Sequence, residues 1–287
     1  TINVTGTGGT LAMNAGLFAG LLDADMGATG DISLAGATLT GVGGTALDLT
    51  AGPATITLNG DLSLGANAMF NSAVVIGNGI TIDMLGGPTL TFDGTVNSSG
   101  AGESLTVEMS GGSAFFLDEV GGADALGTID INGLATTVRF ASPVAAGSLL
   151  VGDLGGGSSP DRVVINDTVT AVSDIELAYT DQLVLGTLDA PTVSITGIGT
   201  NLIFRAPDNI GASVDELNLT TLGSGRIVLV GTQAGDLDVG VAEVSLNSAQ
   251  SIIVTGPTAN WDFRDISFSA ADTIVFATMT ESVDWRQ

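Results

Sequence analysis

Short segments of alternating apolar and polar residues recur along the chain at a nearly constant interval. When Ile32, Ile56, Ile80, Leu105 and Ile129 are taken as equivalent positions, the steps between them are 24, 24, 25 and 24 residues. Later steps are less even, at roughly 20 to 25 residues. Self-similarity at a period of this size is typical of solenoids and repeat arrays. The repeat therefore predicts a chain built from stacked, similar units.

The repeated segments have the two-residue period of half-buried strands. They include DISLAG at 31–36, ATITLNG at 54–60, GITIDML at 79–85, SLTVEMSG at 104–111, GTIDINGL at 127–134, PTVSITG at 191–197, VDELNLT at 214–220 and AEVSLNS at 242–248. Between them lie turn-forming sequences rich in glycine, asparagine, aspartate and proline, such as LNGD, GNG, LGGP and VGGAD. An interval of about 24 residues fits two or three short strands joined by tight corners.

We therefore predict an all-β fold, a parallel β-solenoid (β-helix) of roughly 11–12 coils of about 20–25 residues each. Residues 1–287 would form a single domain, on the order of 55 Å long at about 4.8 Å per coil. A β-propeller blade needs about 40–45 residues, which is two of these units. A β-sandwich remains the second interpretation, although the sequence has few two-residue hairpin signals.

The composition limits the chemistry that the chain can perform. It has 31 acidic residues, six arginines and no lysine, histidine or cysteine, with a formal net charge of −25. Such a charge repels phosphate, so neither nucleic acid nor an anionic membrane is expected as a partner. Without thiols or imidazoles, the chain cannot form the usual zinc, haem or iron–sulfur sites, nor a Ser-His-Asp or Cys-His nucleophile system. A hard cation bound by oxygen ligands remains possible.

The stretch at 92–140 carries a motif that resembles the repeats of filamentous-haemagglutinin-like exoproteins. The residues that match the family pattern are Val120, Gly121, Gly122, Ala125, Leu126, Gly127, Ile129, Ile131 and Gly133, and TLTFDGTVN at 89–97 matches the preceding strand. The resemblance implies a right-handed parallel β-helix, exported to a bacterial cell surface or its matrix, that acts in adhesion, aggregation or filament building. The Asn-Pro-rich signature of the family's secretion domain is not found in the chain.

Adjacent acids in this motif raise the question of catalysis. Asp118 and Glu119 follow two phenylalanines, and paired carboxylates can act as acid and base. Solenoid enzymes that act on polysaccharides usually combine clustered acids with histidine, lysine or arginine, whereas this chain has only six scattered arginines. We therefore expect solvated acids at a turn, no catalytic residues and no enzymatic activity.

Calcium is the ligand that the acidic residues favour most. GGTALDL at 43–49 and GGADALG at 121–127 share part of the calcium-binding nonapeptide pattern, but neither occurs in tandem. We expect no cofactor apart from weak calcium binding at acidic corners, for which the candidates are Asp23, Asp25, Asp48 and Asp124.

Two segments differ from the repeat. Residues 11–27 are predicted either as a short helix that caps one end of the coil stack or as an irregular coil. Residues 261–287 form an aromatic and arginine-containing terminal coil and tail, with both tryptophans. Because tryptophan and arginine are enriched in binding hot spots, we expect head-to-tail self-association through Trp261, Arg264, Trp285 and Arg286.

These observations predict a non-enzymatic structural protein outside the cell, on a bacterial cell surface. Its expected partners are other copies of itself or other cell-surface components. No apolar run approaches the 18 residues that would insert a helix into a bilayer. The alternatives are an adhesin stalk or carbohydrate-binding module and, second, a polysaccharide-degrading β-helix enzyme.

Overall fold

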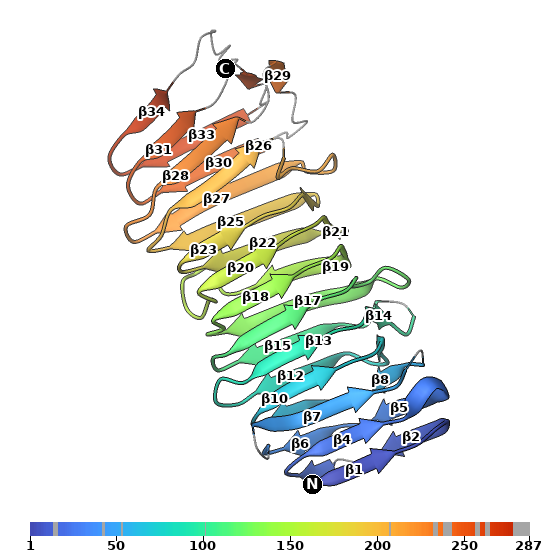
Figure 1. Ribbon diagram of the computed structural model, residues 1–287. Helices are drawn as coiled ribbons and strands as arrows, with labels where there is room; N and C mark the ends of the chain where they lie inside the picture. The colour runs from blue at the N-terminus through green and yellow to red at the C-terminus, as the bar shows by residue number, and fades with distance from the viewer. Residues whose placement is uncertain are drawn as a thin grey trace.

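The chain forms a parallel β-solenoid, which confirms the predicted fold class (Figure 1). The structure is a computed structural model that describes residues 1–13, 17–41, 44–52, 54–100, 102–206, 208–231, 235–237, 243–255, 259–261 and 265–277. Successive coils stack into a rod, with β1 at one end and β34 at the other. Strands of neighbouring coils pair in parallel along the rod, so backbone hydrogen bonds run in the direction of its long axis.

One face of the rod, here called the first face, starts with a nine-stranded sheet. It consists of β1 (Ile2–Thr5), β4 (Leu22–Asp25), β7 (Thr45–Thr50), β10 (Asn67–Phe70), β13 (Thr89–Phe92), β16 (Ser113–Phe116), β18 (Thr137–Phe140), β20 (Arg162–Ile165) and β23 (Gln182–Val184). After a break in the ladder, a four-stranded sheet takes the same place in the later coils. It consists of β26 (Leu202–Ala206), β28 (Ile227–Gly231), β31 (Ile252–Thr255) and β34 (Ile274–Ala277).

The longest sheet forms another face. It contains β3 (Leu17–Ala19), β6 (Ala37–Leu39), β9 (Leu62–Leu64), β12 (Ile80–Met84), β15 (Leu105–Met109), β17 (Leu126–Gly133), β19 (Val144–Val151), β22 (Asp174–Tyr179), β25 (Thr192–Ile198), β27 (Glu216–Leu222), β30 (Glu243–Ser248) and β33 (Asp265–Ala270). Two further strands, β21 (Val169–Ala171) and β24 (Leu188–Asp189), attach beside this path. Removing them from the 14 strands of the sheet leaves twelve successive strands along the rod.

The remaining face is covered by shorter strands. A five-stranded sheet contains β2 (Gly9–Met13), β5 (Gly30–Leu34), β8 (Ile56–Leu58), β11 (Val74–Ile76) and β14 (Val96–Ser98). Single bridges from Val96 to Val120 and from Val120 to Val144 carry this face into the next coils. Farther along, β29 (Gly235–Leu237) pairs with β32 (Ala259–Trp261).

The predicted register is right for three of its four steps and wrong for one. Ile32 pairs with Ile56, Ile80 with Leu105, and Leu105 with Ile129. Ile56, however, pairs with Val74, because it lies on the five-stranded face whereas Ile80 lies on the longest sheet. Strands on both faces have the same alternating pattern, so a step of 24 residues can pass from one face to the other without a change in the sequence signal.

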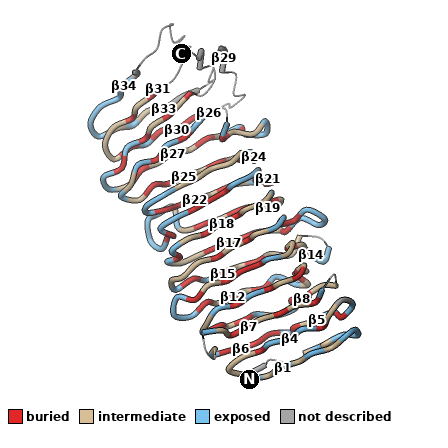
Figure 2. The backbone as a smooth tube through the Cα atoms, viewed as in Figure 1, coloured by how far each residue is buried: buried red, intermediate tan, exposed pale blue. Residues whose placement is uncertain are grey.

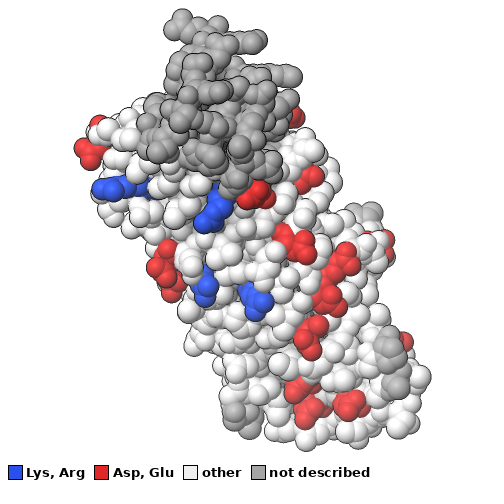
Figure 3. All heavy atoms as spheres, turned by 45° about the horizontal axis from the view of Figure 1, so that its top comes forward, with Lys and Arg blue, Asp and Glu red and all other residues white. Residues whose placement is uncertain are grey.

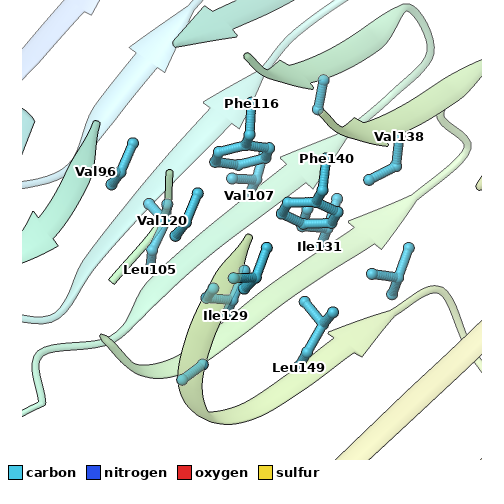
Figure 4. Close-up of a cluster of buried hydrophobic side chains, with 14 of the residues drawn as sticks. Val96, Leu105, Val107, Phe116, Val120, Ile129, Ile131, Val138, Phe140 and Leu149 are labelled. Atoms are coloured by element: carbon cyan, nitrogen blue, oxygen red, sulfur yellow. The ribbon is translucent and has the colours of Figure 1, made fainter. Parts of the chain in front are cut away.

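The interior is one continuous stack of apolar side chains. Burial alternates along the strands, as Figure 2 shows, and the inward positions are occupied mainly by Leu, Ile, Val and Ala. Four phenylalanines, Phe70, Phe92, Phe116 and Phe140, occupy matching positions on β10, β13, β16 and β18. Their rings stack with centroid separations of 4.8, 5.0 and 4.8 Å, and two of them are labelled in Figure 4.

The helix considered for residues 11–27 is wrong. The described part of this segment belongs to β2, β3 and β4, followed by a single 3-10 turn at Gly27–Thr29. Alternation at Leu22–Asp25, with Leu22 and Ala24 buried, outweighs helical propensity because these side chains join the core of the stack. None of the described helical segments is long and apolar enough to span a membrane.

Candidate functional surface

The Asp118–Glu119 pair lies at a turn, as the sequence predicts. Both side chains are exposed, and the Glu119 backbone N–H donates to Asp118 Oδ1 at 2.8 Å. The Glu119 carbonyl oxygen accepts a hydrogen bond from the Val96 N–H of the adjacent coil at 3.0 Å. These two acids therefore lie exposed to solvent at the corner that leads to Gly121, and their hydrogen bonds help to form it.

The calcium candidates are divided between two places. Asp23 and Asp48 are register partners on β4 and β7, and Asp25 lies two residues from Asp23 on the same outward side. Asp124 is exposed in the turn after Gly122, on another part of the coil. Asp25 Oδ1 accepts from the Gly27 N–H at 2.9 Å, as expected for a carboxylate at a turn. No group of three or more acidic side chains within the described ranges has the arrangement of a metal site.

The predicted self-association residues cannot be placed in the same way. Trp261 is the last residue of β32, and its side chain is not among those that the structure describes. Arg264, Trp285 and Arg286 lie outside the described residues altogether. Within 261–287, however, residues 265–270 and 274–277 form β33 and β34, so this part of the segment continues the coil stack.

Arginine side chains gather on the first face. Arg139 belongs to β18, Arg162 to β20 and Arg205 to β26, while Arg226 directly precedes β28, and all four are exposed. Figure 3 shows the basic side chains in the upper and middle parts of the described surface, where acidic side chains also lie, and only acidic side chains in the lower part. The acids Asp23, Asp25 and Asp48 occupy the same face at the β1 end.

The sequence contains a signal for this separation that is independent of the repeat. Residues 1–138 contain 13 acids and no base, whereas residues 139–287 contain the other 18 acids and all six arginines. The sequence does not show on which face of the rod each charged residue lies, because the outward and inward positions of each strand become distinguishable only when its coil closes.

Apolar residues also point outward near the β34 end of the first face. Ile203, Val228, Ile253 and Val275 form one register ladder across β26, β28, β31 and β34. Ile203 is 49 % exposed and Val275 is 40 % exposed. The sequence signal is a strand that is apolar at its outward as well as its inward positions, as in LIFRA and IVLVG. This end of the face therefore combines aliphatic and guanidinium groups.

Among the residues whose side chains are described, Glu176 has the only carboxyl group with a resolved pKa shift. Burial raises the pKa of the Glu176 carboxyl above its ordinary value, and the nearby charge of Asp174 raises it further. Perturbed carboxyl groups can mark active sites. Here, however, the register neighbours are Leu150 and Ser194, so no second acid or base lies directly beside Glu176 on the adjacent strands.

Replacing Glu176 with glutamine is expected to stabilise the rod at neutral pH. Because the folded pKa is raised, the charged carboxylate costs stability above that pKa, and this cost disappears as the pH falls toward the unfolded value of about 4.5. The melting temperature of Glu176→Gln should therefore exceed that of the parent at pH 7, and the two should converge near pH 4. Glu119→Gln, at an exposed turn, serves as the control; an equal effect of both variants at pH 7 would contradict the burial argument.

No family model, curated protein or solved structure matches the chain in the comparisons with known proteins. The features of the molecule that bear on function are its extended rod, the uneven distribution of charge along one face and the outward aliphatic ladders. All of them suit contact with another macromolecule.

Proposed function

We propose that the chain is an extracellular structural protein, a building block of a bacterial surface fibre, filament or matrix. The observation that carries this proposal is the continuous ladder of the longest sheet along the rod. Twelve strands of one sheet follow one another along the axis, each paired only with the coils before and after it. A chain folded in this way is elongated, because each coil contacts only its neighbours and every added coil lengthens the rod.

The composition supports the proposed location. A surface with 31 acids and six arginines remains soluble and offers few cleavage sites for trypsin-like proteases. The absence of cysteine leaves the stability of the rod to packing and backbone pairing. The resemblance of residues 92–140 to filamentous-haemagglutinin-like repeats points to the same setting.

Head-to-tail association is the proposed mode of growth. In the described part of the chain, β1, β2 and β3 each have a strand partner on one side only. Unpaired strand edges of this kind can accept another strand, and a heterologous contact between unlike ends grows a filament instead of a closed ring. The tryptophans and arginines of 261–287 would supply side-chain contacts at the other end.

Electron microscopy of the purified chain, with and without calcium, tests the proposal. We expect filaments with an axial repeat of about 6 nm, the length of a rod of twelve stacked strands at about 4.8 Å per strand. Trp285→Ala combined with Arg286→Ala should shorten or abolish them, and Ser158→Ala, in an exposed loop, serves as a matched control. Filaments that are unchanged in the double variant would remove the terminal contact from the proposal. Isolated short rods under both conditions would instead favour an adhesin stalk or a carbohydrate-binding module.

A further inference from the structure

In the part of the chain that the structure describes, the arginines of the first face have no charge partner. Within the described residues, none of the side chains of Arg139, Arg162, Arg205 and Arg226 forms an ion pair with a carboxylate. Arg226 alone has a side-chain hydrogen bond, from Nε to Gln250 Oε1 at 3.3 Å. These four guanidinium groups, which no described carboxylate pairs with, are available to an acidic partner.

An acidic surface of matching position lies on the same face of the same chain. Asp23 on β4 and Asp48 on β7 are register partners and point outward at the β1 end. Asn71 Nδ2 donates to Asp48 Oδ1 at 2.7 Å, which leaves the other carboxylate oxygen of Asp48 without a hydrogen bond to a described residue. The described strands of the first face are therefore acidic toward the β1 end and carry arginines toward the other end, where the exposed Asp161 and Asp181 flank Arg162 and its register partner Gln182.

Between these two ends, the outward ladder of the first face is mainly apolar. Its residues, which are successive register partners, are Met69, Thr91, Phe115, Arg139, Val164 and Val184. Met69 is 42 % exposed, and Phe115 and Val184 are partly exposed, whereas Thr91 and Val164 are buried, so the exposed apolar area of this ladder comes from Met69, Phe115 and Val184. An apolar centre flanked by charged groups is the usual composition of a protein interface.

We propose that two copies of the chain pack side by side through their first faces, with the rods antiparallel. The two-fold axis would pass between Phe115 and Arg139. In the outward register ladder of the first face, Asp48 lies three strands before Phe115. If β26 is taken as the strand that follows β23, Ile203 lies three strands after Arg139. The axis therefore brings Asp48 of one copy opposite the strand that carries Arg205 in the other.

The charge pattern selects the antiparallel arrangement over the parallel one. In a parallel pair, each strand would face its own copy, so Arg205 would face Arg205 and Asp48 would face Asp48. In the antiparallel pair, the acidic end of each copy faces the basic end of the other. At the centre, Arg139 of one copy faces Phe115 of the other, where a guanidinium group can stack on the aromatic ring.

The size of the face sets the expected strength of the contact. From β4 to β28 the face has ten strands, eight in the nine-stranded sheet and two in the four-stranded sheet. At about 4.8 Å per strand and about 13 Å of strand length, each copy would bury about 600 Å². A total of about 1,200 Å² is at the lower limit of stable interfaces, so we expect a dimer with micromolar affinity.

The arrangement can be tested by exchanging the charges at the two ends of the face and measuring the dimer dissociation constant by sedimentation. All variants also carry Trp285→Ala and Arg286→Ala, which remove the proposed end contacts. Asp23→Arg with Asp48→Arg should weaken dimerisation at least about tenfold, and Arg205→Asp with Arg226→Asp should do the same. All four changes in one chain should restore the dimer, because the exchanged ends again face opposite charges. Loss in both pairs without restoration would overturn the antiparallel register.

A matched control separates this contact from general repulsion between acidic rods. Asp83→Arg with Glu108→Arg makes the same charge change on β12 and β15, away from the first face. These changes should leave the affinity unchanged or raise it slightly, since the net charge of −25 becomes smaller in magnitude. A parent chain that stays monomeric at high micromolar concentration would overturn the proposal, whatever the outcome for filaments.

Distances between spin labels give a second, independent measurement. The chain has no cysteine, so single cysteines can be introduced as label sites without background. In the antiparallel dimer, labels at Asn3→Cys should lie about 50 Å apart, because they are near opposite ends of the assembly, and labels at Asp118→Cys should lie within about 30 Å. A short distance at Asn3→Cys would indicate parallel packing and contradict the inference.

Discussion

Replacing Phe116 with alanine is expected to destabilise the middle of the rod by about 4 kcal/mol. Phe116 is fully enclosed, and its ring stacks on Phe92 at 5.0 Å and on Phe140 at 4.8 Å. The substitution removes the buried ring and breaks both stacking contacts at once. Because each coil contacts mainly its neighbours, we expect the loss to appear as local opening of the adjacent coils.

Trypsin offers a direct measurement of this opening. The chain has no lysine, and its first arginine is Arg139, which directly precedes Phe140 in β18. Cleavage after Arg139 should be at least about 100-fold faster in Phe116→Ala if local opening becomes about 3 kcal/mol easier.

Phe115→Ala is the matched control for this prediction, because Phe115 is adjacent in the same strand and points outward. At chain concentrations too low for the proposed lateral dimer, it should leave the cleavage rate nearly unchanged, and at higher concentrations it should weaken that dimer. Equal acceleration of cleavage by the two variants would show that the stacked rings have no special part in holding the coils together.

Replacing Gly121 with alanine is expected to cost about 2–5 kcal/mol. Gly121 has φ of +75°, which side chains other than glycine rarely adopt, and its added Cβ would lie 2.0 Å from the carbonyl oxygen of Ala145 in the next coil. The Gly121 N–H also donates to the Val96 carbonyl oxygen at 2.7 Å. The substitution therefore forces the backbones of adjacent coils apart at the corner where these three residues meet.

The neighbouring Gly122 provides the matched control for denaturant unfolding. A Cβ at Gly122 would meet the side chain of Glu119, at 2.1 Å from its carboxyl carbon, and an exposed flexible side chain can move away. Gly122→Ala should therefore cost less than about 1 kcal/mol. A Gly121→Ala chain as stable as the parent would show that the corner can widen without disturbing the pairing of the coils.

The candidate surface could be predicted only in part. The turn position of Asp118 and Glu119 follows from their place before two glycines, and the structure confirms it. The four acids proposed as calcium ligands were recognised by type alone, and the fold separates Asp124 from the others. The pairing of Asp23 with Asp48 joins residues 25 positions apart, and no local pattern specifies such a contact.

The sequence by itself determined the kind of coil. Alternation of apolar and polar residues, interrupted by glycine-rich turns at a nearly constant period, is a local property that favours parallel stacking. It also determined the chemistry that is available, since a chain without histidine, lysine or cysteine cannot build the usual nucleophilic or soft-metal sites.

Only the tertiary structure decided which residues lie above one another. Coils of unequal length meet on three faces with the same alternating pattern, so Ile56 pairs with Val74 and not with Ile80. The gathering of the arginines on one face was decided in the same way, because the side to which a residue points depends on where each corner turns. Local sequence sets the alternation, whereas closure of the coils and packing of the shared core set the register between them.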